Sequence, residues 1–312
     1  MPDVKTDLRE ATAEFSCEGI LSEKNLKIEN DNGVNVINGS LTIEIGDTDS
    51  VQIRVRQAQK KRKAGAYTNE ENPIYAGIAT VMDEYVSVAD GGRENATRVR
   101  VNKGQYKPYY SARADREVAS YQASFFTRVE ADRAQESFAT FEFEAFIAGV
   151  RAEVYSQGEN QGEQTGRAII SCWIPMYGGA ISPVELIAPK EDGIADAVLS
   201  GTFNNGSTVT FYGNIVNRKV VKTTTIPVKI GQPKVTTTTS YTNEFVITGA
   251  SEEETEDKAF DPQVIKMAIE ERRQKNEEAK NNARNSNGNG SGSSFGTSHS
   301  GSTSTSSRAL PF

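Results

Sequence analysis

Lysine, arginine and tyrosine residues concentrate between Val51 and Arg128. This window holds fourteen Lys and Arg against eight Asp and Glu, a balance of +6 in a chain of net charge -7, so the rest of the chain stands at -13. No acid interrupts residues 51–69, which hold the first cation group: Arg54, Arg56, Lys60, Lys61, Arg62 and Lys63. The second cation group comprises Arg98, Arg100, Lys103, Lys107 and Arg113. The interleaved aromatic residues are Tyr67, Tyr75, Tyr106, Tyr109 and Tyr110. Cations neutralise phosphates and flat rings stack on unpaired bases, so this pattern predicts a surface for single-stranded nucleic acid.

Parts of this pattern have a structural alternative. The run from Lys60 to Lys63 is also typical of a solvated hairpin tip. The segment from Tyr106 to Tyr110 is interrupted by Pro108 and is predicted to be a loop, whose tyrosines would stay exposed. Trp173 and Phe143 lie in apolar runs and are predicted to be core residues. No pattern distinguishes DNA from RNA.

Catalytic chemistry has little support in the sequence. The only histidine, His299, lies in a Gly, Ser and Thr run where nothing would orient its ring, which argues against histidine-based triads and histidine metal sites. The phosphate-binding loops Gly-x-x-x-x-Gly-Lys-[Ser/Thr] and Gly-x-Gly-x-x-Gly do not occur. We therefore expect no enzyme activity, no cofactor and no metal. A Mg²⁺-dependent nuclease built from carboxylates alone stays open as an alternative.

The cysteines and the apolar content bear on the compartment. Cys17 and Cys172 are far apart, and each is expected to be a small buried strand residue with a reduced thiol. The sequence shows no apolar signal-peptide core and no run of about 20 apolar residues. We expect a cytoplasmic protein.

Strand patterns fill residues 15–135, where we expect a first OB-like β domain after an N-terminal arm of residues 1–14. Gly-Ser-Leu-Thr-Ile-Glu-Ile from Gly39 and Val-Gln-Ile-Arg-Val-Arg from Val51 alternate as half-buried strands do. After the turn at Asn72-Pro73, apolar residues share one helical face, namely Ile74, Ile78, Val81, Met82 and Tyr85. Strands then resume from Ala96 and from Ser120.

Residues 136–249 repeat this scheme. Strands are expected from Phe141, Arg167, Val184 and Gly206, with a short helix around residues 195–199 before the last of them. The order of three strands, a short helix and a strand is that of an OB-type barrel. An extra hairpin is expected from residues 223–230 and 234–248, turned at Gly231-Gln232-Pro233. The alternative is that the halves are two unrelated β domains.

The C-terminal part changes character. Residues 250–284 are expected to be an acidic segment and a helix, with Asp261 as N-cap and Pro262 at the first helical position. Residues 285–312 are Gly, Ser, Asn and Thr rich and are expected to be a disordered tail. Its tip, Leu310, Pro311 and Phe312, could anchor in a pocket on a partner protein. An unstructured end without a role is the alternative.

This plan resembles that of bacterial and phage single-stranded-DNA-binding proteins, which combine an OB body with a flexible tail ending in Pro-Phe. The segments Phe138–Gly149, Thr165–Ala188, Val209–Ile230 and Tyr241–Gly249 are also similar to DNA-binding proteins of phages of Gram-positive bacteria. The bacterial tip carries acids just before Pro-Phe, whereas this chain has Arg308 there. The resemblance implies a protein that protects single-stranded DNA during phage replication or recombination and recruits replication or recombination proteins through its tail. The alternative is a virion or other structural protein that binds no nucleic acid.

Overall fold

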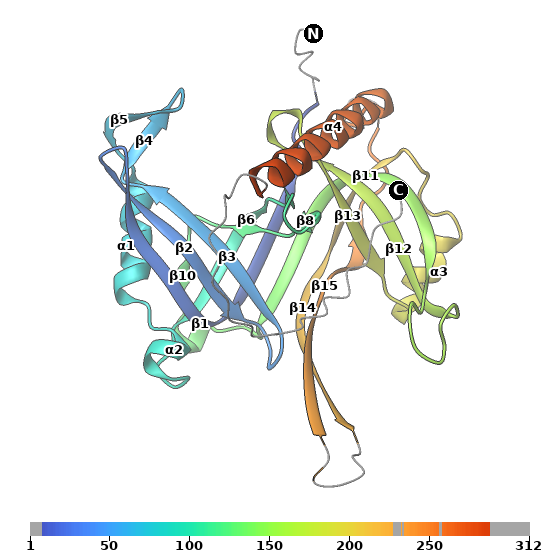
Figure 1. Cartoon of the computed structure of the whole chain (residues 1–312), viewed down its shortest axis with the longest axis horizontal. Coiled ribbons are helices and arrows are strands. Elements are labelled where there is room, and N and C mark those ends of the chain that lie inside the picture. The colour runs from blue at the N-terminus through green and yellow to red at the C-terminus, as the bar shows by residue number, and fades with distance from the viewer. Residues whose placement is uncertain (1–7, 227–231, 233, 256–257, 288–312) are drawn as a thin grey trace.

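Strands dominate the computed structural model, which describes residues 8–226, 232, 234–255 and 258–287 (Figure 1). The expected mainly β class is confirmed. The predicted anchor residues Leu310, Pro311 and Phe312 lie outside the described residues, as does most of the segment expected to be a disordered tail.

Five strands of the N-terminal half pair in a closed ring. They are β1 (Ala13–Asp31), β2 (Val34–Glu44), β3 (Ser50–Ala58), β6 (Arg98–Tyr106) and β9 (Tyr121–Gln122). Antiparallel pairs join β1 to β2, β2 to β3, β9 to β6 and β6 to β1, while β3 and β9 run parallel. This is the Greek-key order of an OB barrel, and we call it the first barrel.

Smaller elements decorate the first barrel. After β3 come the hairpin β4 (Lys60–Lys63) and β5 (Ala66–Glu71), then α1 (Pro73–Glu84) and α2 (Val88–Gly91). Between β6 and β9 the chain makes the hairpin β7 (Tyr109–Ser111) and β8 (Arg116–Val118). The strand β10 (Thr127–Arg128) pairs with β6, and the short helix η1 (Ala131–Arg133) leads out of the barrel. The helix expected after Asn72 is confirmed, and the Asn72 side chain accepts a hydrogen bond from the backbone N–H of Ile74.

The C-terminal half forms a second ring with the same connectivity, which we call the second barrel. Its strands are β11 (Phe138–Val154), β12 (Gln164–Pro175), β13 (Ile181–Ala188), β14 (Thr208–Ile226) and β15 (Lys234–Ala250). The pairs β11–β12, β12–β13, β14–β15 and β11–β14 are antiparallel, and β13–β15 is parallel. The short helices η2 (Tyr177–Gly179) and η3 (Glu191–Gly193) and the helix α3 (Ile194–Leu199) complete it. Two OB-like barrels with short helices are thus present. A division into separate domains at residues 135 and 136 stays a prediction.

The expected antiparallel pairing of residues 223–226 with residues 234–237 is present in the second barrel, but as part of longer strands. The strands expected from Gly206 and from Thr223 form a single strand, β14, of 19 residues. Its partner β15 supplies the fifth strand of the barrel and then continues beside β14 as a projecting two-stranded ribbon (Figure 1). The ribbon is therefore an extension of two barrel strands.

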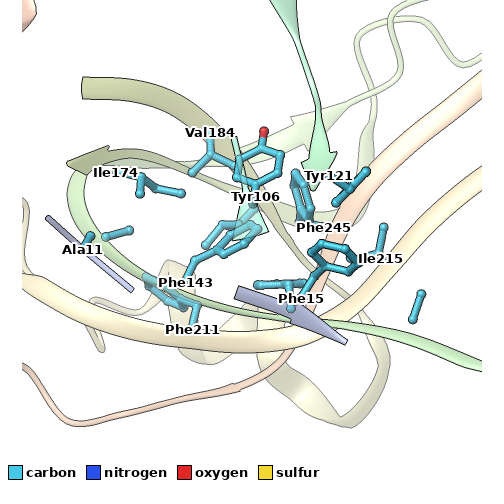
Figure 2. Packing of buried hydrophobic residues seen from close by; sticks show 14 of the residues in the cluster. Ala11, Phe15, Tyr106, Tyr121, Phe143, Ile174, Val184, Phe211, Ile215 and Phe245 are labelled. Atoms are coloured by element: carbon cyan, nitrogen blue, oxygen red, sulfur yellow. The ribbon is translucent and has the colours of Figure 1, made fainter. Parts of the chain in front are cut away.

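A continuous sheet and a common core join the barrels. Residues 13–18 of β1 pair with residues 138–143 of β11, which makes one sheet of 11 strands. Aromatic rings meet beneath this seam, where Tyr106 stacks on Phe143 at 4.9 Å between ring centroids and Phe245 packs edge-on against both (Figure 2). Cys17 and Cys172 are buried as expected, and burial raises the pKa of both thiols.

The C-terminal helix α4 (Pro262–Asn287) contacts both barrels. The Asp261 side chain accepts from the N–H of Gln263 at 2.7 Å, which confirms the expected N-cap. Arg272 donates to the carbonyl of Ile181 at 2.8 Å and pairs with Glu117, while Lys280 pairs with Asp115 at 2.6 Å. Neither α4 nor any other helix in the described part of the chain is long and apolar enough to cross a membrane.

Candidate nucleic-acid interface

The outer face of β3 carries a row of polar side chains. Val51, Ile53 and Val55 point into the first barrel and are buried. The alternate residues Gln52, Arg54 and Arg56 are therefore exposed, because successive strand residues face opposite sides of a sheet. On β2, Ser40 lies opposite Arg54 and Asn38 opposite Arg56. The predicted alternation thus places two arginines on an open polar face.

Arg54 lies against a tyrosine from a distant segment. Its Nη2 donates to the Tyr109 hydroxyl oxygen at 2.9 Å, and its guanidinium carbon lies 4.9 Å from the centroid of the same ring. Tyr109, in β7, remains 40% exposed. The hairpin β7–β8 therefore places a partly exposed tyrosine ring beside the arginine of β3. The sequence predicted both residues as binding residues, but it did not predict that they are in contact.

At the other end of the β3 face, two cations and a tyrosine gather around Asp31. Arg56 pairs with Asp31 at 2.8 Å, and the Tyr67 hydroxyl donates to the same carboxylate at 2.7 Å. Arg62 lies 5.0 Å from the centroid of the Tyr67 ring. The hydrogen bond from Tyr67 and the charge of Arg56 hold the pKa of Asp31 below its usual value, and the same hydrogen bond raises the pKa of Tyr67. This cluster joins the hairpin β4–β5 to the turn between β1 and β2.

The lysine run in β4 is partly neutralised. Lys60 lies opposite Glu71 of β5 and pairs with it, and Lys61 pairs with Glu70 at 3.0 Å. Lys63 is exposed near the hairpin turn, and no ion pair with it is found within the described residues. The sequence window without acids ended at residue 69, just before the acids that face these lysines. Lys60 and Lys61 therefore contribute less positive potential to this surface than the sequence predicted.

Arg98 and Arg100 are held by a buried carboxylate. Glu18 is 0% exposed, and it accepts from Arg98 Nε at 2.7 Å, Arg100 Nε at 2.6 Å and the N–H of Gln135 at 3.0 Å. Burial alone would raise the pKa of Glu18, but these hydrogen bonds together hold it below its usual value. Because both guanidiniums satisfy this carboxylate, we leave Arg98 and Arg100 out of the proposed interface.

Two of the predicted stacking tyrosines are placed elsewhere. Tyr106 is only 5% exposed and belongs to the aromatic core between the barrels, so the expectation of an exposed ring there is wrong. It ends β6 with its side chain inward, before the loop that begins near Pro108. Tyr75 is half-buried in α1 and packs against the core. Tyr106 therefore has no open face for a base, and Tyr75 is only partly exposed.

The remaining predicted residues are scattered around the first barrel. Lys103 lies 3.7 Å from Glu14, in a depression on the seam between the barrels. Tyr110 donates to Asp115 at 2.6 Å and lies under Lys280 of α4. Lys107 is half-buried, and Arg113 is exposed in the turn of β7–β8. We therefore define the first-barrel face as Arg54, Arg56, Arg62, Lys63, Tyr67 and Tyr109.

A second basic region is not among the residues predicted from the sequence. Residues 218–243 hold five cations and no acid, namely Arg218, Lys219, Lys222, Lys229 and Lys234. Threonines dominate this stretch, of which residues 223–230 and 234–248 were predicted only as an extra hairpin. A count of charge along the chain would have found it. Arg218 pairs with Asp49 at 3.4 Å, and Lys219 N–H donates to the Thr48 carbonyl at 2.9 Å, so the base of the ribbon contacts the first barrel.

The arrangement offers cations and aromatic rings. Within the described residues, no three His, Cys, Asp or Glu side chains are grouped to hold a metal ion. Cations and exposed rings in this arrangement could bind a polymer that carries anionic groups and planar rings.

The sequence model of the YorF family matches residues 12–282. The chain belongs to the YorF family. The match spans both barrels of this YorF family member and most of α4. No curated protein matches it in sequence.

Two solved structures resemble this YorF family member at low similarity. The wild-type single-stranded DNA binding protein from Thermus aquaticus gives a TM-score of 0.44 at 11% identity, covering 80% of this chain and 95% of that one. A deletion mutant of the Thermus aquaticus protein gives 0.43 at 12% identity, covering 81% and 98%. The strand pairings establish the two barrels independently of these likenesses.

Proposed function

We propose that this YorF family member binds single-stranded DNA along the first-barrel face, largely independently of sequence and without reacting with it. The observation that carries the proposal is the row on β3, where Arg54 and Arg56 alternate outward. Tyr109 lies beside Arg54, and Tyr67 lies near Arg56 through Asp31. The outer surface around the second and third strands of an OB barrel commonly serves oligonucleotides.

The side chains of the first-barrel face suit binding through the phosphate backbone of DNA, which does not depend on base sequence. Arg54, Arg62 and Lys63 have no carboxylate partner among the described residues, so they are available to phosphates. Tyr109 and Tyr67 supply rings on which bases of any type can stack. Affinity should therefore fall steeply with salt, because each neutralised phosphate releases counterions.

The proposal extends to a biological setting. Following the resemblance to phage and bacterial single-stranded-DNA-binding proteins, we infer a role in protecting DNA during phage replication or recombination in the host cytoplasm. Leu310, Pro311 and Phe312 would recruit a replication or recombination protein. Their deletion should leave DNA affinity unchanged and remove capture of that partner.

The test is fluorescence anisotropy of the full chain with a labelled oligo-dT of about 30 nucleotides, titrated at two salt concentrations beside a duplex of equal length. We expect tight, salt-dependent binding to the single strand and weaker binding to the duplex. No binding to the single strand at low salt would reject the proposal. Equal affinity for the duplex would reject the single-strand preference.

A further inference from the structure

A groove runs between the two barrels, next to the first-barrel face, with which it shares Arg54. It has a volume of about 390 Å³ and is bordered by β3, the end of the β7–β8 hairpin and the base of the ribbon β14–β15. Gln52 and Arg54 line it from β3, Arg116 and Ser120 from the hairpin side, and Tyr241 and Asn243 from β15. Both barrels therefore build this groove.

Two polar atoms of the groove lining are buried without a partner. Ser120 is 4% exposed, and its Oγ has no hydrogen-bond partner in the described structure. The same holds for Oε2 of Glu117, whose other oxygen pairs with Arg272 of α4. Buried polar groups are nearly always hydrogen-bonded, and an unpaired one calls for an explanation such as a ligand or ordered water. The groove thus has unused hydrogen-bonding capacity at its wall.

The groove also carries positive charge and an open aromatic ring. Arg54 and Arg116 come from different elements, and neither has an acidic partner among the residues that the structure describes. Tyr241 is 69% exposed, although it is a large aromatic residue on a paired strand. Arginine, an exposed tyrosine and amide side chains are the groups that hold a phosphate, a base face and a base edge.

We propose that this inter-barrel groove binds one unpaired nucleotide of a single strand that crosses from the first-barrel face to the ribbon. Tyr241 stacks on the base, Arg54 and Arg116 bind the flanking phosphates, and Ser120 and Asn243 hydrogen-bond the base edge. Arg218 and Lys219, at the base of the ribbon, extend the basic path beyond the groove. This inference rests on the proposed function, and it makes the second barrel part of the site.

The experiment compares the affinity of the full-length chain and its variants for the same labelled oligo-dT. Tyr241→Ala and Arg116→Gln are each expected to weaken binding about tenfold, and Ser120→Ala about threefold, from the usual worth of a base stack, a phosphate contact and a hydrogen bond. Matched controls are Tyr177→Ala, an exposed tyrosine of the second barrel, and Arg113→Gln, an exposed arginine outside the groove. Both controls should bind more tightly than the corresponding groove variants.

A second measurement locates the contact directly. Oligo-dT carrying one 5-iododeoxyuridine is irradiated with the wild-type chain, and the adduct is mapped by mass spectrometry. An adduct on Tyr241 together with weaker binding by Tyr241→Ala supports the groove.

The outcomes separate this inference from the proposed function. If the wild type binds and loss of Arg54, Arg62 and Lys63 charges weakens binding, while the groove variants match their controls and Tyr241 is not labelled, the groove is overturned and the proposed function stands. If the wild type does not bind the single strand, both are rejected.

Discussion

The two barrels share one strand order but present different outer faces. In the first barrel, β3 alternates between buried Val or Ile and exposed Gln or Arg, so one face is open to solvent. In the second barrel, β12 buries consecutive residues on both of its faces, namely Ala168, Ile169, Ile170, Cys172, Trp173 and Ile174. Elements packed there include α3 against β12 and α4 against β13. A common barrel thus serves as an open polar face in one copy and as a covered scaffold in the other.

The difference in burial indicates which surfaces of the two barrels are open to a ligand. A strand buried on both faces reads as a continuous apolar run, whereas a half-exposed strand alternates. The runs Ala-Ile-Ile-Ser-Cys-Trp-Ile from Ala168 and Val-Gln-Ile-Arg-Val-Arg from Val51 show the two patterns. The second barrel would then contribute through its ribbon and its side of the groove, and not through the face of its own second and third strands.

The largest expected effect removes charge from the first barrel. Replacing Arg54, Arg62 and Lys63 together with Gln should weaken oligo-dT binding about 100-fold at moderate salt. It should also lower the slope of log affinity against log salt by about 2, since each single-strand phosphate contact contributes about 0.7.

The matched control makes the same change in charge outside the first-barrel face. It replaces Lys190, Lys258 and Lys266, which are exposed lysines of the second barrel and of the region around α4, with Gln. An equal loss in this control would mean that net charge, and not the first-barrel face, governs binding. That result would contradict the assignment of binding to the first barrel.

The next effect concerns stability. Glu18→Gln should lower the free energy of unfolding by about 3 kcal/mol, because Arg98 and Arg100 would lose their buried charged partner. Since the folded-state pKa of Glu18 is lowered, its contribution is present above the ordinary glutamate pKa of about 4.3 and is lost as pH falls through the folded value. Thermal melting at neutral and acidic pH should therefore show a smaller acid-induced drop in the variant.

The control for Glu18 lies on the same strand. Glu14→Gln alters a partly exposed residue whose contact with Lys103 is long, and its stability should change by no more than about 0.5 kcal/mol. Folded Glu18→Gln should keep the wild-type salt slope for oligo-dT. A steeper slope would return Arg98 and Arg100 to the interface, because the freed guanidiniums would then contact phosphates.

A single aromatic ring should have a smaller effect on binding. Tyr109→Ala is expected to weaken oligo-dT affinity about tenfold, within the 1–3 kcal/mol typical of one base stack. Tyr109→Phe keeps the ring and loses only the hydroxyl that Arg54 donates to, so it should stay close to wild type. If both variants lose affinity equally, the ring acts by holding Arg54 and not by stacking.

The smallest expected effect releases the paired lysines. Replacing Glu70 and Glu71 with Gln frees Lys60 and Lys61 and should raise oligo-dT affinity about threefold at low salt, with little change at high salt. The control replaces Glu277 and Glu278 of α4, which removes the same charge from a different surface. A gain that is equal in both variants would show a general effect of net charge.

Local patterns predicted most of the fold. The alternation from Val51 to Arg56 gave the outward arginines, and the spacing from Ile74 to Tyr85 gave α1. The Asp261-Pro262 pair gave the start of α4. The merged strand β14 was missed because its polar middle, Asn217 to Lys219, looks like a break between strands.

Long-range contacts account for the differences between the predicted site residues and the first-barrel face. Arg98 and Arg100 look like free cations because their partner Glu18 lies 80 and 82 positions away. Tyr106 was taken for a loop residue because its core partners, Phe143 and Phe245, belong to the other half of the chain. Tyr241, which we propose as a groove residue, could not be predicted because its neighbours across the groove belong to the other barrel. No spacing rule in one sequence reveals such pairs.

The seam between β1 and β11 has a consequence for synthesis of the chain. Residues 13–18 of β1 have β6 on one edge and β11 on the other, and β11 begins only at Phe138. When the ribosome has synthesised only the first barrel, residues 13–18 form an open strand edge. Phe15 and Cys17 then lack their neighbours on β11, Phe141 and Ala139. Open strand edges and uncovered apolar residues favour aggregation. The first barrel is thus incomplete during synthesis, until β11 of the second barrel pairs with the open edge of β1.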